Sequence, residues 1–88
     1  MPLPGSNPPT IRVLLFARYA ELLGAEQFDL PAEGVETAGQ VLEWVRALPG
    51  GARIADGALV AVNLRHASRS ATVAAGDEVA LLPPLAGG

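Results

Sequence analysis

The C-terminal residues are the part of this sequence whose types and spacing best suit a chemical reaction. The chain ends in PPLAGG, residues 83–88. Glycine lacks a Cβ atom, so Gly87 and Gly88 allow the backbone to pass through a narrow channel. Proline stiffens the exit at Pro83, and the segment spans roughly 20 Å when extended at about 3.3 Å per residue. We therefore expect residues 83–88 to form an extended tail that carries its carboxylate into a buried site of another protein.

The terminal carboxylate of Gly88 is the group that such a tail would deliver. A carboxylate is a poor acyl donor, but attachment of AMP turns it into a mixed anhydride that a sulfur nucleophile can open. The product is a C-terminal thiocarboxylate, a portable and nucleophilic form of sulfide. A terminal Gly-Gly pair is weak evidence by itself, because chain ends are often small and polar. The Gly-Gly pair becomes stronger evidence for this chemistry when it is combined with the stiff Pro-Pro exit and with the fold that the rest of the sequence predicts.

Other catalytic arrangements are poorly supported by the sequence. There is one histidine, His66, and no cysteine, so neither a thiolate metal site nor a disulfide is available. The three aspartates and six glutamates are scattered without a paired spacing. No nucleophile elbow or phosphate-binding glycine loop is present. We interpret His66 as a surface or strand-end residue, because metal sites need several convergent donors, and we expect no bound cofactor or metal.

The first part of the chain predicts two strands joined by a short helical turn. Residues 11–17 alternate and have apolar residues on both faces, as in a central strand or one with a face reserved for a partner. Residues 18–23 form a helical turn that stops at Gly24, and residues 26–30 form a second strand paired with the first. One face of the first strand consists of Ile11, Val13 and Leu15, and the other of Arg12, Leu14 and Phe16.

A main helix is predicted after a capping box. Thr37 and Gln40 have the spacing at which each side chain satisfies a backbone N–H of the other. An apolar stripe then follows at helical spacing, and Pro49-Gly50-Gly51 ends the helix. We expect Trp44 to lie in the core within this stripe. The stripe consists of Val41, Trp44, Val45 and Leu48.

The remaining elements are extended. Residues 59–63 form a strand, residues 71–73 a weak extended piece, and Gly76-Asp77 a turn into the last strand, 78–82. Proline at 83 and 84 forbids further ladder hydrogen bonds. A hairpin followed by one helix that crosses a mixed sheet is an α+β arrangement, the β-grasp or ubiquitin-like fold. The near-continuous apolar character of the first and last strands predicts that they lie side by side at the centre.

Composition and charge restrict the class of partner. The chain of 88 residues suits one β-grasp domain at 11–82, with a disordered lead-in at 1–10 and the tail at 83–88. Its formal net charge is −3 and its six scattered basic residues are all arginine, which argues against nucleic acid as a partner. No apolar stretch is long enough for a membrane. We expect a cytoplasmic location.

The sequence resembles the small subunits of molybdopterin synthase, which are ubiquitin-like sulfur carriers of the MoaD/ThiS family. Three segments carry the resemblance in family order: VLLFARYAELLG at 13–24, LVAVN at 59–63 and GDEVALLPPLAGG at 76–88. With the intervening helix, the similarity covers essentially residues 11–88. Family members often have aromatic residues where this chain has Leu81-Leu82, and the two leucines keep the apolar character of those positions.

The resemblance implies a non-catalytic sulfur-donor subunit rather than an enzyme acting alone. A ubiquitin-activating-type enzyme would adenylate Gly88 with ATP, and a sulfur donor protein would convert it to the thiocarboxylate. The tail would then enter the large, catalytic subunit of the synthase and give its sulfur to cyclic pyranopterin monophosphate. Two such transfers make the dithiolene of molybdopterin.

The resemblance also assigns roles to residues. Gly88 would bear the sulfur, Gly87 would permit its close approach, and Pro83, Pro84 and Leu85 would aim the tail. Phe16 and Leu82 match positions where the family docks on its large subunit. These two residues and Leu14 form either an exposed apolar patch on the sheet face away from the helix, or a set buried by loops in a small core.

Three alternatives use the same sequence features differently. A thiamine-pathway sulfur carrier shares the terminal chemistry. A ubiquitin-like modifier would join its terminal glycine to a lysine of a target protein, although this chain has no lysine and cannot serve as a side-chain acceptor for its own kind. A structural binding module would not need Gly87 and Gly88 at all.

Overall fold

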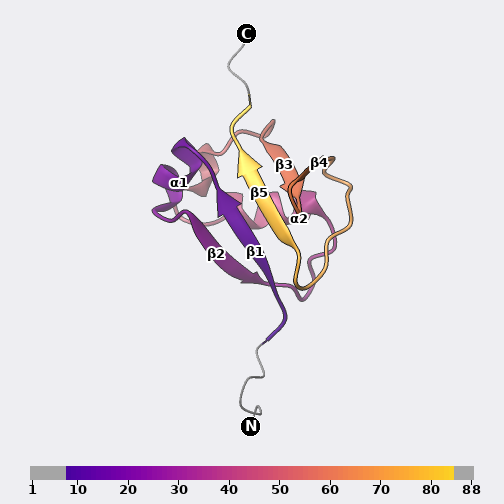
Figure 1. Ribbon diagram of the computed structural model, residues 1–88. Helices are drawn as coiled ribbons and strands as arrows, with labels where there is room; N and C mark the ends of the chain where they lie inside the picture. The colour runs from indigo at the N-terminus through magenta and orange to yellow at the C-terminus, as the bar shows by residue number, and fades with distance from the viewer. Residues whose placement is uncertain (1–7, 85–88) are drawn as a thin grey trace.

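A five-stranded mixed sheet, crossed on one face by a single main helix, forms the fold in the computed structural model, which describes residues 8–84 (Figure 1). The strand order is β2-β1-β5-β3-β4. The α+β β-grasp arrangement predicted from the sequence is therefore confirmed. The elements are β1 (Thr10–Leu15), α1 (Arg18–Leu23), β2 (Gln27–Pro31), α2 (Ala38–Arg46), the 3-10 turn η1 (Gly51–Arg53), β3 (Leu59–Val62), β4 (Arg65–Ala67) and β5 (Glu78–Leu82).

The first and last strands lie together at the centre of the sheet, as their apolar character predicts. β1 and β5 run parallel, with Val13 opposite Val79 and Leu15 opposite Leu81. β2 pairs antiparallel with the free side of β1, and β3 pairs antiparallel with the free side of β5. The ends of β1 and β5 therefore lie at the same edge of the molecule, where the chain leaves β5.

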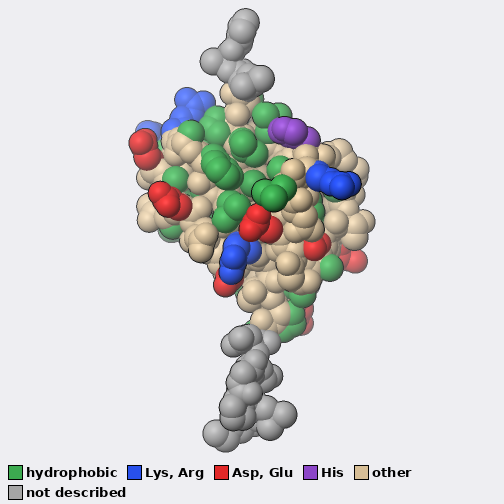
Figure 2. All heavy atoms as spheres, viewed as in Figure 1, with side chains coloured by type: hydrophobic (Ala, Val, Ile, Leu, Met, Phe, Trp, Pro, Cys, Tyr) green, Lys and Arg blue, Asp and Glu red, His purple; other side chains and the backbone are tan. Residues whose placement is uncertain are grey.

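The core lies between the sheet and α2. Alternate residues of the strands face the helix and are almost fully buried, and each such side chain contributes about 1.5–3 kcal/mol of transfer free energy. The opposite face of the sheet carries no helix and faces the viewer in Figure 2. The largest contributors to the core are Ile11, Val13, Tyr19, Leu30, Val41, Leu42, Val45, Ile54, Val79 and Leu81.

The capping box of α2 is present as predicted. The hydroxyl of Thr37 accepts a hydrogen bond from the backbone N–H of Gln40 at 3.2 Å, and the Gln40 side chain accepts one from the N–H of Thr37 at 3.1 Å. Two N–H groups at the start of the helix are thereby satisfied, which fixes where α2 begins.

The prediction that Trp44 lies in the core is wrong. Its side chain is 39% exposed, and Leu42 is buried in its place. At about 100° per residue, the stripe centred on Val41, Leu42 and Val45 leaves Trp44 at the flank of the helix. Residue spacing placed Trp44 within the apolar stripe, but the buried arc of α2 is centred on Ala38 and Val45 and ends before Trp44.

Glycines at the end of α2 let the chain turn tightly under α1. Gly50 has φ of +86°, a conformation that residues with side chains rarely adopt. A Cβ atom on Gly50 would overlap the carbonyl oxygen of Leu22, and one on Gly51 would overlap the carbonyl oxygen of Val45. The turn therefore requires both glycines.

Several predicted boundaries are shifted by one or two residues. β1 ends at Leu15 rather than at residue 17, because Ala17 has φ of +53° and redirects the chain into α1. β2 extends to Pro31, which an edge strand tolerates because one side of it needs no ladder hydrogen bond.

The later part of the sheet also differs from the prediction. β3 ends at Val62 because Asn63 is in a turn with positive φ, and β4 was not predicted. In the expected extended piece at 71–73, only Thr72 forms a bridge, to Thr37.

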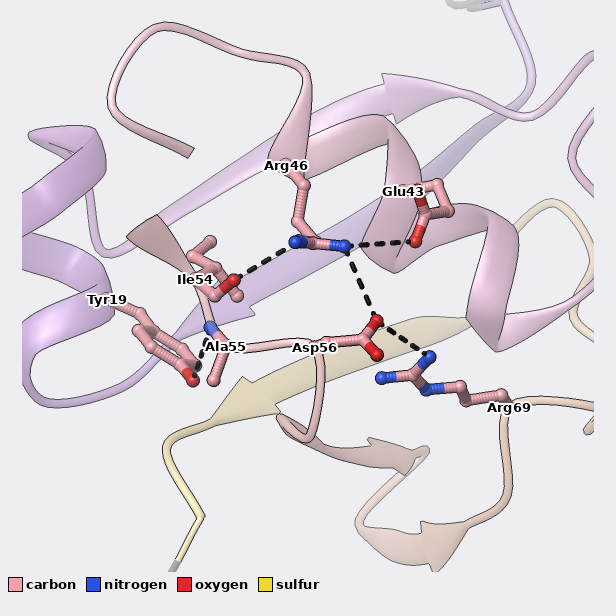
Figure 3. A network of polar contacts seen from close by, with 7 residues as sticks. All are labelled: Tyr19, Glu43, Arg46, Ile54, Ala55, Asp56 and Arg69. Carbon is pink, nitrogen blue, oxygen red and sulfur yellow. Dashed lines mark hydrogen bonds and ion pairs between the residues drawn. The ribbon is translucent and has the colours of Figure 1, made fainter. Parts of the chain in front are cut away.

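A polar network ties the loop before β3 to α2 and to the loop after β4 (Figure 3). The guanidinium of Arg46 donates to the carbonyl of Ile54 at 3.1 Å and pairs with Asp56 at 3.5 Å. Asp56 also pairs with Arg69 at 3.3 Å. Exposed pairs of this kind are worth at most about 1 kcal/mol each, so the network sets the path of the loop more than its stability.

Candidate functional site

The predicted tail leaves the sheet at the edge where β1 and β5 end and where β3 begins. β5 ends at Leu82, which lies opposite Leu59 at the start of β3. Pro83 is half-buried and Pro84 is exposed, and neither is part of a strand. Prolines have no N–H for a ladder hydrogen bond, which accounts for the strand end. The predicted site residues Leu85, Gly87 and Gly88 lie outside the described residues.

The face of the sheet away from α2 carries a group of apolar side chains beside this exit, which we call the outer patch (Figure 2). The strand register places these residues on one face, because Leu14 lies opposite Ala80, and Ala80 lies opposite Ala61. Phe16 is 44% exposed and Leu59 is 37% exposed. No other described element covers the patch. Its residues are Leu14, Phe16, Leu59, Ala61, Ala80 and Leu82.

Backbone contacts on both sides fix the position of Phe16. Its N–H donates to the carbonyl of Leu81 at 3.2 Å, which extends the β1–β5 ladder by one step. Its carbonyl accepts from the N–H of Tyr19 at 3.1 Å in the first turn of α1. Tyr19 is fully buried. An exposed aromatic ring held by a rigid backbone suits a preformed contact surface, because little conformational freedom is lost on binding.

Polar groups border the outer patch near the start of β5. Arg12 and Asp29, on neighbouring strands, form an exposed pair at 3.8 Å. Asp77 accepts from the side-chain amide of Asn63 at 3.1 Å and from the N–H of Ala74 at 2.8 Å. These hydrogen bonds, that from Asn63 first, hold the pKa of Asp77 below its ordinary value because they favour the charged carboxylate.

The described residues offer no alternative catalytic centre. His66 is exposed on the edge strand β4, opposite Ala61, as a surface residue would be. Within residues 8–84, no three potential ligands lie close enough together to hold a metal ion. No helix in this part of the chain has the length and apolar character needed to cross a membrane.

The chain matches a known family over most of its length. Residues 13–88 match the ThiS family. The chain belongs to the ThiS family. It is 35% identical over 79 residues to the molybdopterin synthase sulfur carrier subunit of Arabidopsis thaliana, which covers 89% of this chain and 82% of that protein.

Solved structures agree with this membership. SAMP1, the small archaeal modifier protein 1 of Haloferax volcanii, superposes with a TM-score of 0.74 and 30% identity, covering 90% of this chain and 99% of that one. One chain of the complex of subunits 1 and 2 of molybdopterin-converting factor from Helicobacter pylori gives a TM-score of 0.64 over 90% of this chain and 99% of that one. Its 20% identity shows a common fold only.

The fold brings some of the predicted site residues of this ThiS-family chain together. Phe16 and Leu82 lie on the same face of adjacent central strands, and Pro83 and Pro84 continue directly from Leu82. Sequence reasoning missed Leu59, Ala61 and Ala80 as members of the patch. The signal for Leu59 was available, because alternation along β3 and β5 places every second residue on the outer face once the register is known.

Proposed function

We propose that this chain is the sulfur carrier subunit of a molybdopterin synthase. The observation that carries the proposal is the match to the ThiS family through the terminal Gly87-Gly88, together with the similarity to the Arabidopsis thaliana sulfur carrier subunit. The fold supports the proposal, because it places an apolar surface next to the point from which residues 83–88 depart.

The proposed chemistry takes place at the carboxyl group of Gly88. A ubiquitin-activating-type enzyme uses ATP to form the acyl-adenylate, with release of pyrophosphate. Sulfide supplied by a sulfur donor protein attacks the acyl carbon, AMP departs, and a thiocarboxylate is left. The carrier then gives this sulfur to cyclic pyranopterin monophosphate, and two successive carriers complete the molybdopterin dithiolene. Gly87 contributes by leaving room for the backbone in a narrow channel.

The large subunit of the synthase is the proposed docking partner. Its surface would cover the outer patch through Phe16 and Leu82, and Pro83, Pro84 and Leu85 would direct the tail into its active site. The complex of the two subunits of the Helicobacter pylori factor supports an assembly of this kind. The carrier needs no bound cofactor in this scheme, because ATP is consumed by the adenylating enzyme.

The intact mass of the chain tests the proposal. Incubation with ATP, the adenylating enzyme and a sulfide source is expected to replace one oxygen by sulfur in the C-terminal peptide. Deletion of Gly88, or extension of the chain beyond it, should abolish this mass change while circular dichroism shows an unchanged fold. An extended chain that still supports molybdopterin formation at the wild-type rate would refute the mechanism.

A ubiquitin-like modifier is the second candidate, and the similarity to SAMP1 favours it specifically. A modifier would pass the same acyl-adenylate to a target amine instead of to sulfide. The two functions give different products, because a conjugate has a higher mass whereas the carrier gains only a sulfur atom. Since the chain has no lysine, any conjugate formed through a lysine side chain must contain a different protein as acceptor.

A further inference from the structure

A groove of about 560 Å³ adjoins the outer patch where β1 passes into α1. Leu14 and Phe16 belong to both the groove and the patch, so the two surfaces are continuous. α1 contributes one wall and the start of β2 the other. The groove residues that matter for its chemistry are Leu14, Phe16, Ala20, Glu21, Glu26 and Gln27.

The groove combines an apolar floor with an acidic rim. Glu21 and Glu26 are both exposed, and neither takes part in the ion pairs formed among residues 8–84. Figure 2 shows acidic side chains at the border of the apolar region on this side of the sheet. Arg18, one turn before Glu21 on α1, is the basic residue nearest in sequence and is also exposed. The chain thus presents two unpaired carboxylates beside the surface proposed for docking.

The walls of the groove are held in place by the backbone. The N–H of Leu15 donates to the carbonyl of Glu26 at 2.8 Å, which joins the two strands at the mouth of the groove. Ala17 has φ of +53° and ψ of −133°, a conformation that favours glycine, and it turns the chain sharply from β1 into α1. Strain of this kind persists only where the surrounding structure enforces it, and it is common at binding sites. The groove is therefore preformed.

We propose that the groove receives a lysine or arginine side chain from the large subunit that docks on the outer patch. This inference rests on the proposed function and adds the chemistry of the contact. A basic side chain has a long apolar stem and a charged head, so its stem fits against Leu14 and Ala20 while its head reaches the carboxylates of Glu21 and Glu26. The acidic rim makes this contact a determinant of which large subunit the carrier accepts.

Removal of the two charges tests the electrostatic part of the inference. The Kd of the full chain for its cognate large subunit is measured by calorimetry for the double variant Glu21→Gln/Glu26→Gln. We expect binding to weaken about tenfold at about 50 mM salt and by less than about threefold at about 500 mM salt, because added ions screen the pair. The matched control is Glu33→Gln/Glu36→Gln, which removes the same charge from exposed positions before α2 and should bind like the wild type.

A footprint tests occupancy of the groove without changing its charge. The chain has no cysteine, so Gln27→Cys introduces a single thiol at the groove and Ala52→Cys one on η1, away from it. The bound large subunit should slow alkylation of the thiol at position 27 about tenfold and leave that at position 52 unchanged. In the free chain, both rates should be independent of protein concentration; slowing at position 27 with concentration would show that a second copy fills the groove and would overturn the inference.

The outcomes separate this inference from the proposed function. If the wild-type chain does not bind the large subunit, both the groove contact and the proposed carrier function are refuted. If the wild type binds tightly and the two double variants bind with equal affinity at every salt concentration, the groove contact is refuted. The proposed carrier function is not affected by that result. A charge effect without protection at position 27 would also contradict it, because the carboxylates would then act only at a distance.

Discussion

Leu64 has a left-handed backbone conformation that is unfavourable for a residue with a Cβ atom. With Asn63 it forms the two-residue loop between β3 and β4, and both have positive φ, of 51° for Asn63 and 70° for Leu64. A two-residue hairpin loop with this geometry favours Asn-Gly, so Asn63 fits and Leu64 does not. The Leu64 side chain is 86% exposed and gains little from packing.

Leu64→Gly is expected to stabilise the protein. The left-handed conformation costs a residue with a Cβ atom about 1–2 kcal/mol, and part of that gain is offset by the greater freedom of glycine in the unfolded chain. We expect a net increase of about 0.5–1 kcal/mol in the free energy of unfolding, measured by urea denaturation. Leu64→Ala removes the side chain but keeps the strain, so it serves as the control. Equal stability of the two variants would show that backbone strain is not the cause.

At the scale of elements, a polar clasp joins the β3–β4 hairpin to the start of β5. Asn63 donates to Asp77 through its side-chain amide and accepts from the N–H of Glu78 at 3.0 Å. The N–H of Arg12 donates to the carbonyl of Asp77 at 3.0 Å, which brings β1 into the same clasp. The carboxyl group of Asp77 itself bonds only the Asn63 amide and the N–H of Ala74, so it links the β3–β4 hairpin to the turn before β5.

The clasp predicts a dependence of stability on pH. The pKa of Asp77 is lower in the folded chain than in the unfolded chain, where it is about 3.9, so its contribution is present above that value and is lost as the pH falls through the folded value. The melting temperature of Asp77→Asn should lie below that of the wild type at pH 7, and the gap should close towards about pH 2. Glu33→Gln, at an exposed position away from the clasp, should show no such gap. A gap for Asp77→Asn that stays constant with pH would contradict the assigned role.

The elements that could be predicted from sequence are those with a local physical signal. Thr37 and Gln40 mark the start of α2 because the capping box needs only neighbouring residues. β4 has no such signal, because three residues at a sheet edge form a strand only through pairing with β3. Trp44 was misplaced because its exposure depends on which arc of α2 meets the sheet, and that depends on distant strands.

At the scale of the whole molecule, Phe16 connects the fold to the proposed assembly. We expect Phe16→Arg to weaken binding to the large subunit at least tenfold, because a charge would be buried against an apolar surface. Its effect on the free energy of unfolding should stay within about 0.5 kcal/mol, because the ring is exposed in the free chain. Gel filtration of the mixed subunits and thermal melting of the free variant measure the two effects.

Trp44→Arg is the matched control for this variant. Trp44 is an aromatic residue of similar exposure, 39% against 44%, but it lies on α2, on the other side of the sheet. The same substitution there should leave the heterodimer intact. Loss of the heterodimer in both variants would mean that docking is not confined to the outer patch.

The candidate site could be predicted only in part. Gly87, Gly88 and the two prolines are recognisable because their chemistry follows from residue type and position. The groove rim was not predicted, because Glu21 lies on α1 and Glu26 in the loop before β2, and only the folded β1–α1–β2 unit places both beside one groove. A surface assembled from several elements can be predicted only when the register of the strands is known, and a single sequence does not specify that register.

The parallel pairing of β1 with β5 has a consequence for synthesis on the ribosome. β1 is made first, but its partner at the sheet centre is complete only when Leu82 has been added. Contacts between such distant segments form late and slow folding. A nascent chain that stalls before Glu78 lacks the central strand β5 and two of the six residues of the outer patch, so it is open to proteases. Quality control thus favours carriers that have been translated almost to the terminus on which their proposed function depends.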